Sequence, residues 1–213
     1  MMQFVQKQCR RDRMNTTALR VILIGGPSHG GKSTLAQALS SRLGWHCTST
    51  DRLARYPGRP WGHVRPHVAE HYLSLSPDEL IEDVIRHYAR MWPDIRSLIT
   101  AHASDPSTER LILEGSALWP ESVVTLRLDG VGAIWLTASD SFLQERIYTA
   151  SGFEQAPDQE KALIEKFIGR AQRYNERMMQ ALRLLDLPWV NVEEASSLEN
   201  LVDTSLCLLG TGT

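Results

Sequence analysis

Gly26-Pro27-Ser28-His29-Gly30-Gly31-Lys32-Ser33 is a glycine-rich segment that lies between an apolar run and a helix-forming run. The apolar run covers residues 21–24, and the helix formers cover residues 34–43. The eight residues match the pattern G-x-x-x-x-G-K-[ST], whose glycines let backbone N–H groups approach a bound group closely. A strand, a glycine-rich turn and a helix in this order predict a phosphate-binding loop, or P-loop.

Different groups of this loop are expected to bind different parts of a nucleoside triphosphate. Unpaired N–H groups and the positive end of the helix dipole favour an anion at the start of the helix. Lys32 is expected to reach the β- and γ-phosphates as a point charge, and the hydroxyl of Ser33 is expected to bind Mg²⁺. The expected nucleotide-binding residues in and next to the loop are Gly26, Ser28, His29, Gly30, Gly31, Lys32, Ser33 and Thr34.

Length and composition limit the classes of protein to consider. The 213 residues suit one α/β domain, and a formal net charge of −2 gives no overall nucleic-acid footprint. No apolar stretch approaches the roughly 18 residues that span a bilayer, so we expect no membrane segment. The spacing of the three cysteines, Cys9, Cys47 and Cys207, is not that of metal ligands. The simplest interpretation is that they are reduced thiols in a cytoplasmic protein.

The first 18 residues are polar and basic and lack the apolar core of a secretory signal. They predict a flexible tail ahead of a single domain at 19–213. Met14 is a possible alternative start, and a basic arm that touches a partner stays open as an alternative.

Apolar, β-branched runs alternate with helix-like stretches along the rest of the chain. The runs suit strands buried on both faces and cover residues 21–24, 46–49, 111–113, 133–136 and 189–192. The helix-like stretches cover residues 34–43, 77–91, 94–103, 141–149, 158–185 and 198–209. This alternation predicts an α/β fold with a parallel sheet and helices on both of its faces.

The connection at residues 52–108 is too long for one crossover helix and predicts a helical insertion that binds a phosphoryl acceptor. Its first part is rich in cations and rings, namely Arg52, Arg55, Tyr56, Arg59, Trp61, His63, Arg65 and His67. Such density favours an anionic or ring-bearing acceptor, held by the four arginines. A structured loop with exposed arginines is the alternative.

Two carboxylates end predicted strands where ligands bind in α/β proteins. Asp51 is expected to orient or deprotonate an acceptor hydroxyl, or to hold Mg²⁺ through water. Glu114 is expected to assist Mg²⁺ or the acceptor. Capping of a helix by Asp51 and of a turn by Glu114 are the alternatives.

Arginines that follow the fourth strand complete the expected site. Arg146 is expected to stack on adenine or to bind phosphates. Arg170 and Arg173 share one helix face and fit a lid over the transferred phosphate, because guanidinium binds phosphate in bidentate geometry. Arg177 fits a solvated basic face at least as well. The expected catalytic residues are Lys32, Asp51, Arg146 and Arg170.

Together, the P-loop, Ser49-Thr50-Asp51-Arg52, Leu113-Glu114-Gly115 and Phe142-Leu143-Gln144-Glu145-Arg146 resemble the P-loop kinases of small molecules. Within that superfamily the chain is most similar to 2-phosphoglycerate kinase-like, zeta-toxin-like and chloramphenicol phosphotransferase-like proteins. The resemblance implies a five-stranded parallel sheet in the order 2-3-1-4-5. It also implies ATP and Mg²⁺ as cofactors and transfer to a hydroxyl or phosphate of a cytoplasmic metabolite. The short, arginine-free segment 149–157 departs from classical adenylate kinases, which argues against nucleoside monophosphate acceptors.

Two other classes compete with a metabolite kinase. Asp129-Gly130-Val131-Gly132 fits the D-x-x-G pattern of GTPase switches, but no N-K-x-D guanine motif occurs and Asp129 precedes its strand. A nucleic-acid end kinase or an ATP-binding regulatory module shares every motif named above. The near-neutral net charge argues against an extended nucleic-acid-binding surface. Neither oligomeric state nor acceptor identity follows from the sequence.

Overall fold

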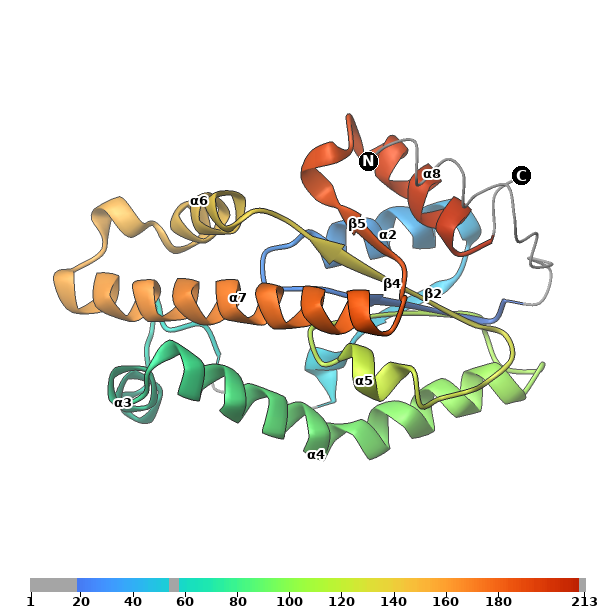
Figure 1. Cartoon of the computed structure of the whole chain (residues 1–213), viewed down its shortest axis with the longest axis horizontal. Helices are drawn as coiled ribbons and strands as arrows, with labels where there is room; N and C mark the ends of the chain where they lie inside the picture. Colours follow the sequence, from blue (N-terminus) through green and yellow to red (C-terminus); the bar gives the residue numbers. More distant parts are fainter. Residues whose placement is uncertain (1–18, 54–57, 211–213) are drawn as a thin grey trace.

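The computed structural model describes residues 19–53 and 58–210 (Figure 1). The predicted tail at 1–18, the alternative start Met14 and the predicted acceptor ligand Arg55 lie outside the described residues. A five-stranded parallel sheet forms the centre of the described part, in the order β2-β3-β1-β4-β5. Its strands are β1 (Val21–Gly25), β2 (His46–Ser49), β3 (Leu111–Glu114), β4 (Val131–Thr137) and β5 (Trp189–Asn191). The predicted fold class and strand order are confirmed.

Helices cover both faces of the sheet. One face carries α2 (Lys32–Leu43) and α8 (Leu198–Leu208), and the other carries α4 (Pro77–Ser104), α5 (Pro120–Val123) and α7 (Asp158–Leu184). In Figure 1 the first pair lies above the sheet, and α4 and α5 lie below it. The strand β1 shows how the two cores arise: Val21 and Leu23 join the α4/α7 side, while Ile22 and Ile24 join the α2/α8 side. Alternate side chains of a strand point to opposite faces, so a continuous apolar run serves both.

A third apolar cluster lies outside the two sheet cores. It joins α3 (Pro66–Ser74) and α6 (Asp140–Ser151) to the first half of α7, with Tyr72, Ile147 and Phe167 as buried members. Short 3₁₀ turns complete the described part at η2 (Thr50–Arg52), η3 (Phe153–Gln155) and η4 (Val192–Glu194). This cluster holds α3 and α6 close to the end of the sheet where the P-loop lies.

The strand at the sheet edge differs from the expectation of burial on both faces. In β2, His46 is exposed and Cys47, Thr48 and Ser49 are half-buried. An edge strand has one neighbour only, and here it pairs with β3 alone. The position of β2 in the sheet, which its residues do not encode, explains the difference.

The two helices predicted at 77–91 and 94–103 form one continuous helix, α4, with Pro93 inside it. Proline removes one intrahelical hydrogen bond, so a break at this point was the natural expectation. Pro93 is exposed, whereas Met91, Ile95 and Ile99 are buried against the sheet. Packing on both sides of the proline therefore offsets the lost hydrogen bond, and Figure 1 shows α4 bent midway.

Two helices were not predicted. Both α3 and α5 start with a proline at the first helical position, Pro66 and Pro120, where the missing N–H has no cost. The start signal was present in the sequence but lay in stretches that read as loops.

The structure bears on the expectations for the cysteines and for a membrane-spanning segment. Cys47 is a free thiol, but Cys207 takes part in a disulfide, so the expectation of reduced thiols is wrong for Cys207. In the described part of the chain, no helix combines the length and the apolar character that crossing a bilayer requires.

Candidate active site

The P-loop connects β1 to α2 and has the backbone geometry that its glycines predict. Gly26 has φ 142°, and a Cβ there would lie 2.7 Å from the carbonyl oxygen of Leu136. Gly31 has φ 88° and is the N-cap of α2. Both fixed glycines are therefore required sterically, one by its neighbour and the other by its left-handed conformation.

Lys32 is buried at the first position of α2, with 8% of its surface exposed. Its Nζ donates a hydrogen bond of 2.8 Å to the carbonyl oxygen of Pro27, within the loop itself. Burial lowers the pKa of Lys32, and the nearby carboxylates of Glu114 and Asp51 act in the opposite direction. The three predicted functional residues therefore lie within electrostatic reach of one another.

Ser33 and Glu114, which are 81 positions apart in the chain, form a direct contact. Ser33 Oγ donates a hydrogen bond of 3.1 Å to Oε1 of Glu114, whose side chain is buried. A hydroxyl and a carboxylate are the oxygen ligands that Mg²⁺ prefers beside phosphate groups and water. Within residues 19–53 and 58–210 no group of three His, Cys, Asp or Glu side chains is arranged to hold a metal ion. The donor set thus fits a metal that the nucleotide itself helps to hold.

Asp51 lies in η2, directly after β2, and its side chain is exposed. The hydroxyl of Ser49 accepts the backbone N–H of Asp51, so Ser49 and not Asp51 caps this turn. Beside it, Thr50 is fully buried against Gly115, where a Cβ would lie 1.8 Å from Thr50 Oγ1. This close approach brings the ends of β2 and β3 together and places Asp51 and Glu114 at one edge of the sheet.

His29 is a loop residue with unusual surroundings. It has φ 64°, a left-handed conformation that is uncommon outside glycine. Its ring centroid lies 5.8 Å from that of Trp61 and 6.0 Å from that of Phe167. Burial, followed by the charges of Arg59, Lys32 and Arg146, lowers the pKa of His29 to about 4, so the imidazole is neutral at physiological pH. Within the described residues neither ring nitrogen has a hydrogen-bond partner.

Of the two arginines predicted to act on the nucleotide, Arg146 lies next to the loop, and Arg170 covers the Phe167 ring, which packs against His29. A Cβ on Gly31 would lie 3.8 Å from Nη1 of Arg146, whose guanidinium also covers the Phe142 ring at 5.3 Å. Arg170 is 8% exposed, and its guanidinium carbon lies 4.5 Å from the centroid of the Phe167 ring. It also covers Tyr72 at 5.4 Å. Aromatic faces thus hold both guanidinium groups.

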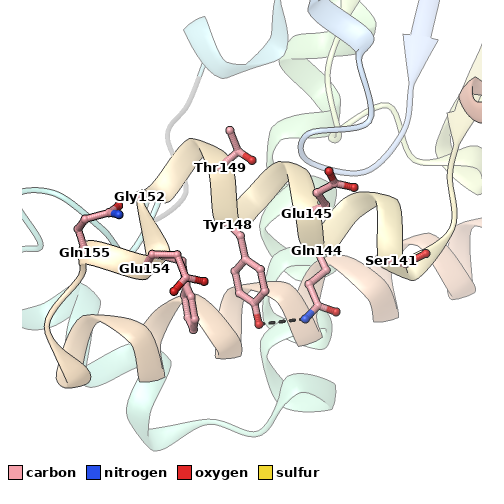
Figure 2. Close-up of a pocket in the computed structure, with 9 residues that line it drawn as sticks. Ser141, Gln144, Glu145, Tyr148, Thr149, Gly152, Glu154 and Gln155 are labelled. Atoms are coloured by element: carbon pink, nitrogen blue, oxygen red, sulfur yellow. Dashed lines mark hydrogen bonds between the residues drawn. The ribbon is translucent and has the colours of Figure 1, made fainter.

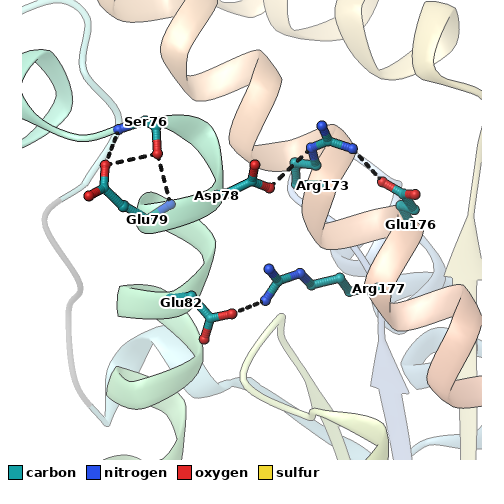
Figure 3. Close-up of polar contacts among 7 residues, drawn as sticks. All are labelled: Ser76, Asp78, Glu79, Glu82, Arg173, Glu176 and Arg177. Atoms are coloured by element: carbon teal, nitrogen blue, oxygen red, sulfur yellow. Dashed lines mark hydrogen bonds and ion pairs between the residues drawn. The ribbon is translucent and has the colours of Figure 1, made fainter.

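Two other arginines of α7, Arg173 and Arg177, face the neighbouring helix α4. Arg173 forms ion pairs with Asp78 at 3.3 Å and Glu176 at 2.8 Å, and Arg177 pairs with Glu82 of α4 (Figure 3). The sequence predicts Arg173 as a lid residue beside Arg170, but its ion-pair partners place it on the surface between α4 and α7. The predicted acceptor ligands Arg52 and Arg65 are exposed.

A chain of hydrogen bonds that sequence reasoning missed ties α7 to the P-loop. Tyr174 donates a hydrogen bond of 2.7 Å to the carbonyl oxygen of Ser116, and Ser116 Oγ donates one of 2.9 Å to the carbonyl oxygen of Gly26. Tyr88 of α4 lies near the same place. Burial raises its pKa to about 12, with Arg170 and Asp51 among the charges that act on it. Periodicity marked these tyrosines only as parts of helix faces, so no local signal identified them.

Two cavities lie away from the loop. One, of about 480 Å³, runs along α6 and η3 and includes Gln144, which donates a hydrogen bond to Tyr148 (Figure 2). The other, of about 680 Å³, lies between α4 and α7 and is lined mainly by charged residues. Neither contains a residue of the P-loop, so the candidate site rests on the loop and its neighbours.

The D-x-x-G segment lies at the opposite end of the sheet. The carbonyl oxygen of Gly130 accepts hydrogen bonds from the backbone N–H groups of Arg20 and Val21, at the start of β1. The P-loop follows the other end of β1. Asp129 is thus not placed to contact a nucleotide, which agrees with the sequence argument against a GTPase switch.

Comparisons with known proteins bear on the fold and the family. The family described as AAA domain matches residues 22–165. A cytidylate kinase of Pseudomonas fluorescens (strain Pf0-1) is 28% identical over 137 residues, which are 64% of this chain and 52% of that protein. A tRNA dimethylallyltransferase of Rhodospirillum centenum (strain ATCC 51521 / SW) is 33% identical over 106 residues, 46% of this chain and 32% of that protein. The chain thus spans about half of the one relative and a third of the other.

Among solved structures, a gluconokinase from Sinorhizobium meliloti 1021 is similar with a TM-score of 0.53. The identity is 19%, and the match covers 90% of this chain and 92% of that one. At this level of identity the similarity shows a shared fold.

Proposed function

This chain belongs to the AAA domain family, and from that premise we propose that it is an ATP-dependent kinase that phosphorylates a small, anionic metabolite. The observation that carries the proposal is the convergence of Lys32, Ser33 and Glu114 at the mouth of the P-loop. A lysine for the phosphates and two oxygen ligands for the metal are the parts that phosphoryl transfer requires. The named kinases among the relatives and similar structures agree with this class of reaction.

The residues of the site share the steps of the transfer. The acceptor oxygen attacks the γ-phosphorus, the bond from that phosphorus to the bridging oxygen of ADP breaks, and the acceptor proton passes to Asp51. Lys32, Arg146 and Arg170 balance the negative charge of the phosphoryl group as it moves. Mg²⁺, held by Ser33 and Glu114 with Asp51 acting through water, would neutralise the phosphate oxygens.

The segment 52–108 is proposed to hold the acceptor. Arg52 and Arg65 are exposed cations there, and Asp51 with Arg170 marks the inner boundary next to Tyr72 and Tyr88. A cationic and aromatic boundary suits a metabolite that carries a carboxylate or a phosphate. The narrower similarity to 2-phosphoglycerate kinase-like and zeta-toxin-like proteins, and a cytoplasmic location, are part of this proposal.

A metabolite screen tests the proposed function. The full chain is incubated with ATP and Mg²⁺ and a library of sugar acids, phosphorylated three-carbon acids, nucleosides and 5′-hydroxyl oligonucleotides, and ADP release is measured. We expect release above the acceptor-free background with a small anionic compound, and none with Lys32→Ala. Release only with oligonucleotides would support the nucleic-acid end kinase instead. Undiminished transfer by Lys32→Ala would remove the assigned role of the lysine.

A further inference from the structure

The neutral imidazole of His29 lies among three cations, and one of them comes from the segment that is proposed to hold the acceptor. Lys32 belongs to the P-loop and Arg146 to α6 next to it, but Arg59 belongs to the segment proposed to bind the acceptor. Arg59 also lowers the pKa of Lys32 itself. Its charge therefore acts near Lys32, the residue that is proposed to bind the outer phosphates of a nucleotide.

Contacts between rings place Arg59 beside the P-loop. Its guanidinium carbon lies 5.9 Å from the centroid of the Trp61 ring, which packs against His29 at 5.8 Å. The same indole meets Phe167 of α7 edge to face, with centroids 4.9 Å apart and an angle of 80°. One residue further, the N–H of Gly62 donates a hydrogen bond of 2.8 Å to Oε1 of Glu160. The segment around Trp61 is thus held by α7 and rests on the P-loop.

The charge of Arg59 is not balanced by a carboxylate in the described ranges 19–53 and 58–210, where its guanidinium makes no ion pair. Its side chain is exposed, so it can reach a ligand without leaving a buried position. Burial and the charges of Arg59, Lys32 and Arg146 keep His29 neutral, so the imidazole adds no fourth positive charge beside these three. Together these features leave a concentration of positive charge where a polyanion would bind.

We propose that Arg59 contacts the terminal phosphate of the bound nucleoside triphosphate, with Trp61 as the residue that positions it. This inference rests on the proposed function and changes one part of it, because Arg59 then acts on the phosphoryl donor and not on the acceptor. An arginine supplied within the chain stabilises the charge of the transferred phosphoryl group. In this arrangement one residue of the acceptor-binding segment takes part in binding the donor nucleotide.

Calorimetric titration with two nucleotides tests the contact without any acceptor. The full chain and Arg59→Ala are titrated with AMP-PNP and with ADP, each in the presence of Mg²⁺. A contact to the terminal phosphate predicts an affinity for AMP-PNP about ten-fold weaker in Arg59→Ala, the size of a typical charge-assisted hydrogen bond. The affinity for ADP should change by less than about two-fold, because ADP lacks the phosphate that Arg59 would contact.

Two further variants test whether the effect depends on the position of Arg59 or only on the loss of a positive charge. Arg96→Ala removes another exposed arginine, on the outer part of α4, and should leave both affinities unchanged. Trp61→Leu keeps the charge of Arg59 but removes the ring beneath it, and should weaken AMP-PNP selectively by a smaller factor. Matching melting temperatures of the unliganded Arg59→Ala and unaltered chains would confirm that the fold is intact.

The outcomes distinguish the inference from the function on which it rests. If the unaltered chain binds AMP-PNP and Arg59→Ala binds it equally well, the proposed contact of Arg59 with the terminal phosphate is wrong, and the proposed kinase function stands. Equal losses for AMP-PNP and ADP would also overturn it, since the terminal phosphate would not be the partner. If the unaltered chain binds neither nucleotide, the proposed function fails together with the inference.

Discussion

Lys32 is a buried cation whose pKa depends on two carboxylates from the ends of β2 and β3. Burial lowers its pKa, whereas Glu114 and Asp51 favour its charged form. A bound triphosphate adds further negative charge beside the ammonium group, which also favours the charged form. Besides the role as metal ligands that we propose for them, the two carboxylates therefore favour the positive state of the lysine.

Asp51 is expected to affect the rate far more than nucleotide binding. Asp51→Asn keeps the size of the side chain but removes its basicity, so turnover with the acceptor found by the screen should fall about 100-fold or more. The Kd for ATP should change by less than about three-fold. Steady-state kinetics and calorimetry measure the two quantities. Equal losses of rate and affinity would assign Asp51 a structural role.

Gly115 is expected to be intolerant of any side chain. In Gly115→Ala the new Cβ would lie 1.8 Å from Oγ1 and 2.9 Å from Cβ of Thr50, whose side chain is fully buried. Overpacking of this kind should lower the free energy of unfolding by at least about 2 kcal/mol. Urea titration measures this loss, and the double variant Gly115→Ala with Thr50→Gly should recover part of it. A single variant as stable as the unaltered chain would show that the two strand ends are not in close contact.

His29 predicts a pH dependence of stability. Its pKa is lowered to about 4 in the folded state from about 6.5 in the unfolded chain, so the unfolded state binds a proton first as the pH falls. The contribution of the neutral imidazole is therefore complete above pH 6.5 and is lost between pH 6.5 and 4. His29→Asn keeps a residue that tolerates positive φ and does not titrate.

Melting temperatures at pH 7.5, 6, 5 and 4 test this prediction. The unaltered chain should lose stability more steeply than His29→Asn across that range. Parallel curves for the two proteins would mean that the imidazole is not buried in neutral form.

At the scale of elements, the two long helices are joined by exposed ion pairs. Arg173 and Arg177 of α7 pair with Asp78 and Glu82 of α4 (Figure 3). Exposed pairs of this kind contribute roughly 0–1 kcal/mol each. The apolar contacts of Tyr174, Met178 and Leu182 with the α4 side of the core are therefore the main link between these helices.

The start of α4 has a reciprocal capping box. Ser76 accepts the N–H of Glu79, and the Glu79 carboxylate accepts the N–H of Ser76 at 2.8 Å. Ser76→Ala should cost about 1 kcal/mol of unfolding free energy, measured by urea titration. The hydrogen bonds from Ser76 lower the pKa of Glu79, so this stabilisation is lost as the pH falls through the carboxylate range. A variant with an unchanged free energy of unfolding would show that packing alone fixes the start of α4.

At the scale of the whole molecule, nucleotide binding and folding are linked, because the P-loop has its binding geometry only when β1 and α2 are in place. A ligand at 100 times its Kd adds about 2.7 kcal/mol to the free energy of unfolding. For a domain of this size we expect AMP-PNP with Mg²⁺ to raise the melting temperature by about 5–10 °C. Scanning fluorimetry measures the shift, and Lys32→Ala is the control that should show little of it. A chain whose melting temperature does not respond would contradict a preformed nucleotide site.

The sequence by itself determined the features that depend on neighbouring residues. The P-loop binds through the backbone of eight consecutive positions, so its pattern is complete in one stretch of chain. The alternation of apolar runs with helix-like stretches likewise gave the α/β class and helices on both faces, and similarity to known kinases gave the strand order. Asp51 and Glu114 could be predicted as candidate site residues because each lies at or directly after the end of a recognisable strand.

Tertiary structure alone decided which distant side chains meet. The contact of Ser33 with Glu114, the approach of Thr50 to Gly115 and the packing of His29 against Trp61 and Phe167 join residues that are far apart in the chain. It also decided that α4 continues through Pro93 and that β2 lies half-exposed at the edge. The physical reason is the same in each case: the energy of these arrangements comes from neighbours brought close by the sheet, and a residue's sequence surroundings carry no record of them.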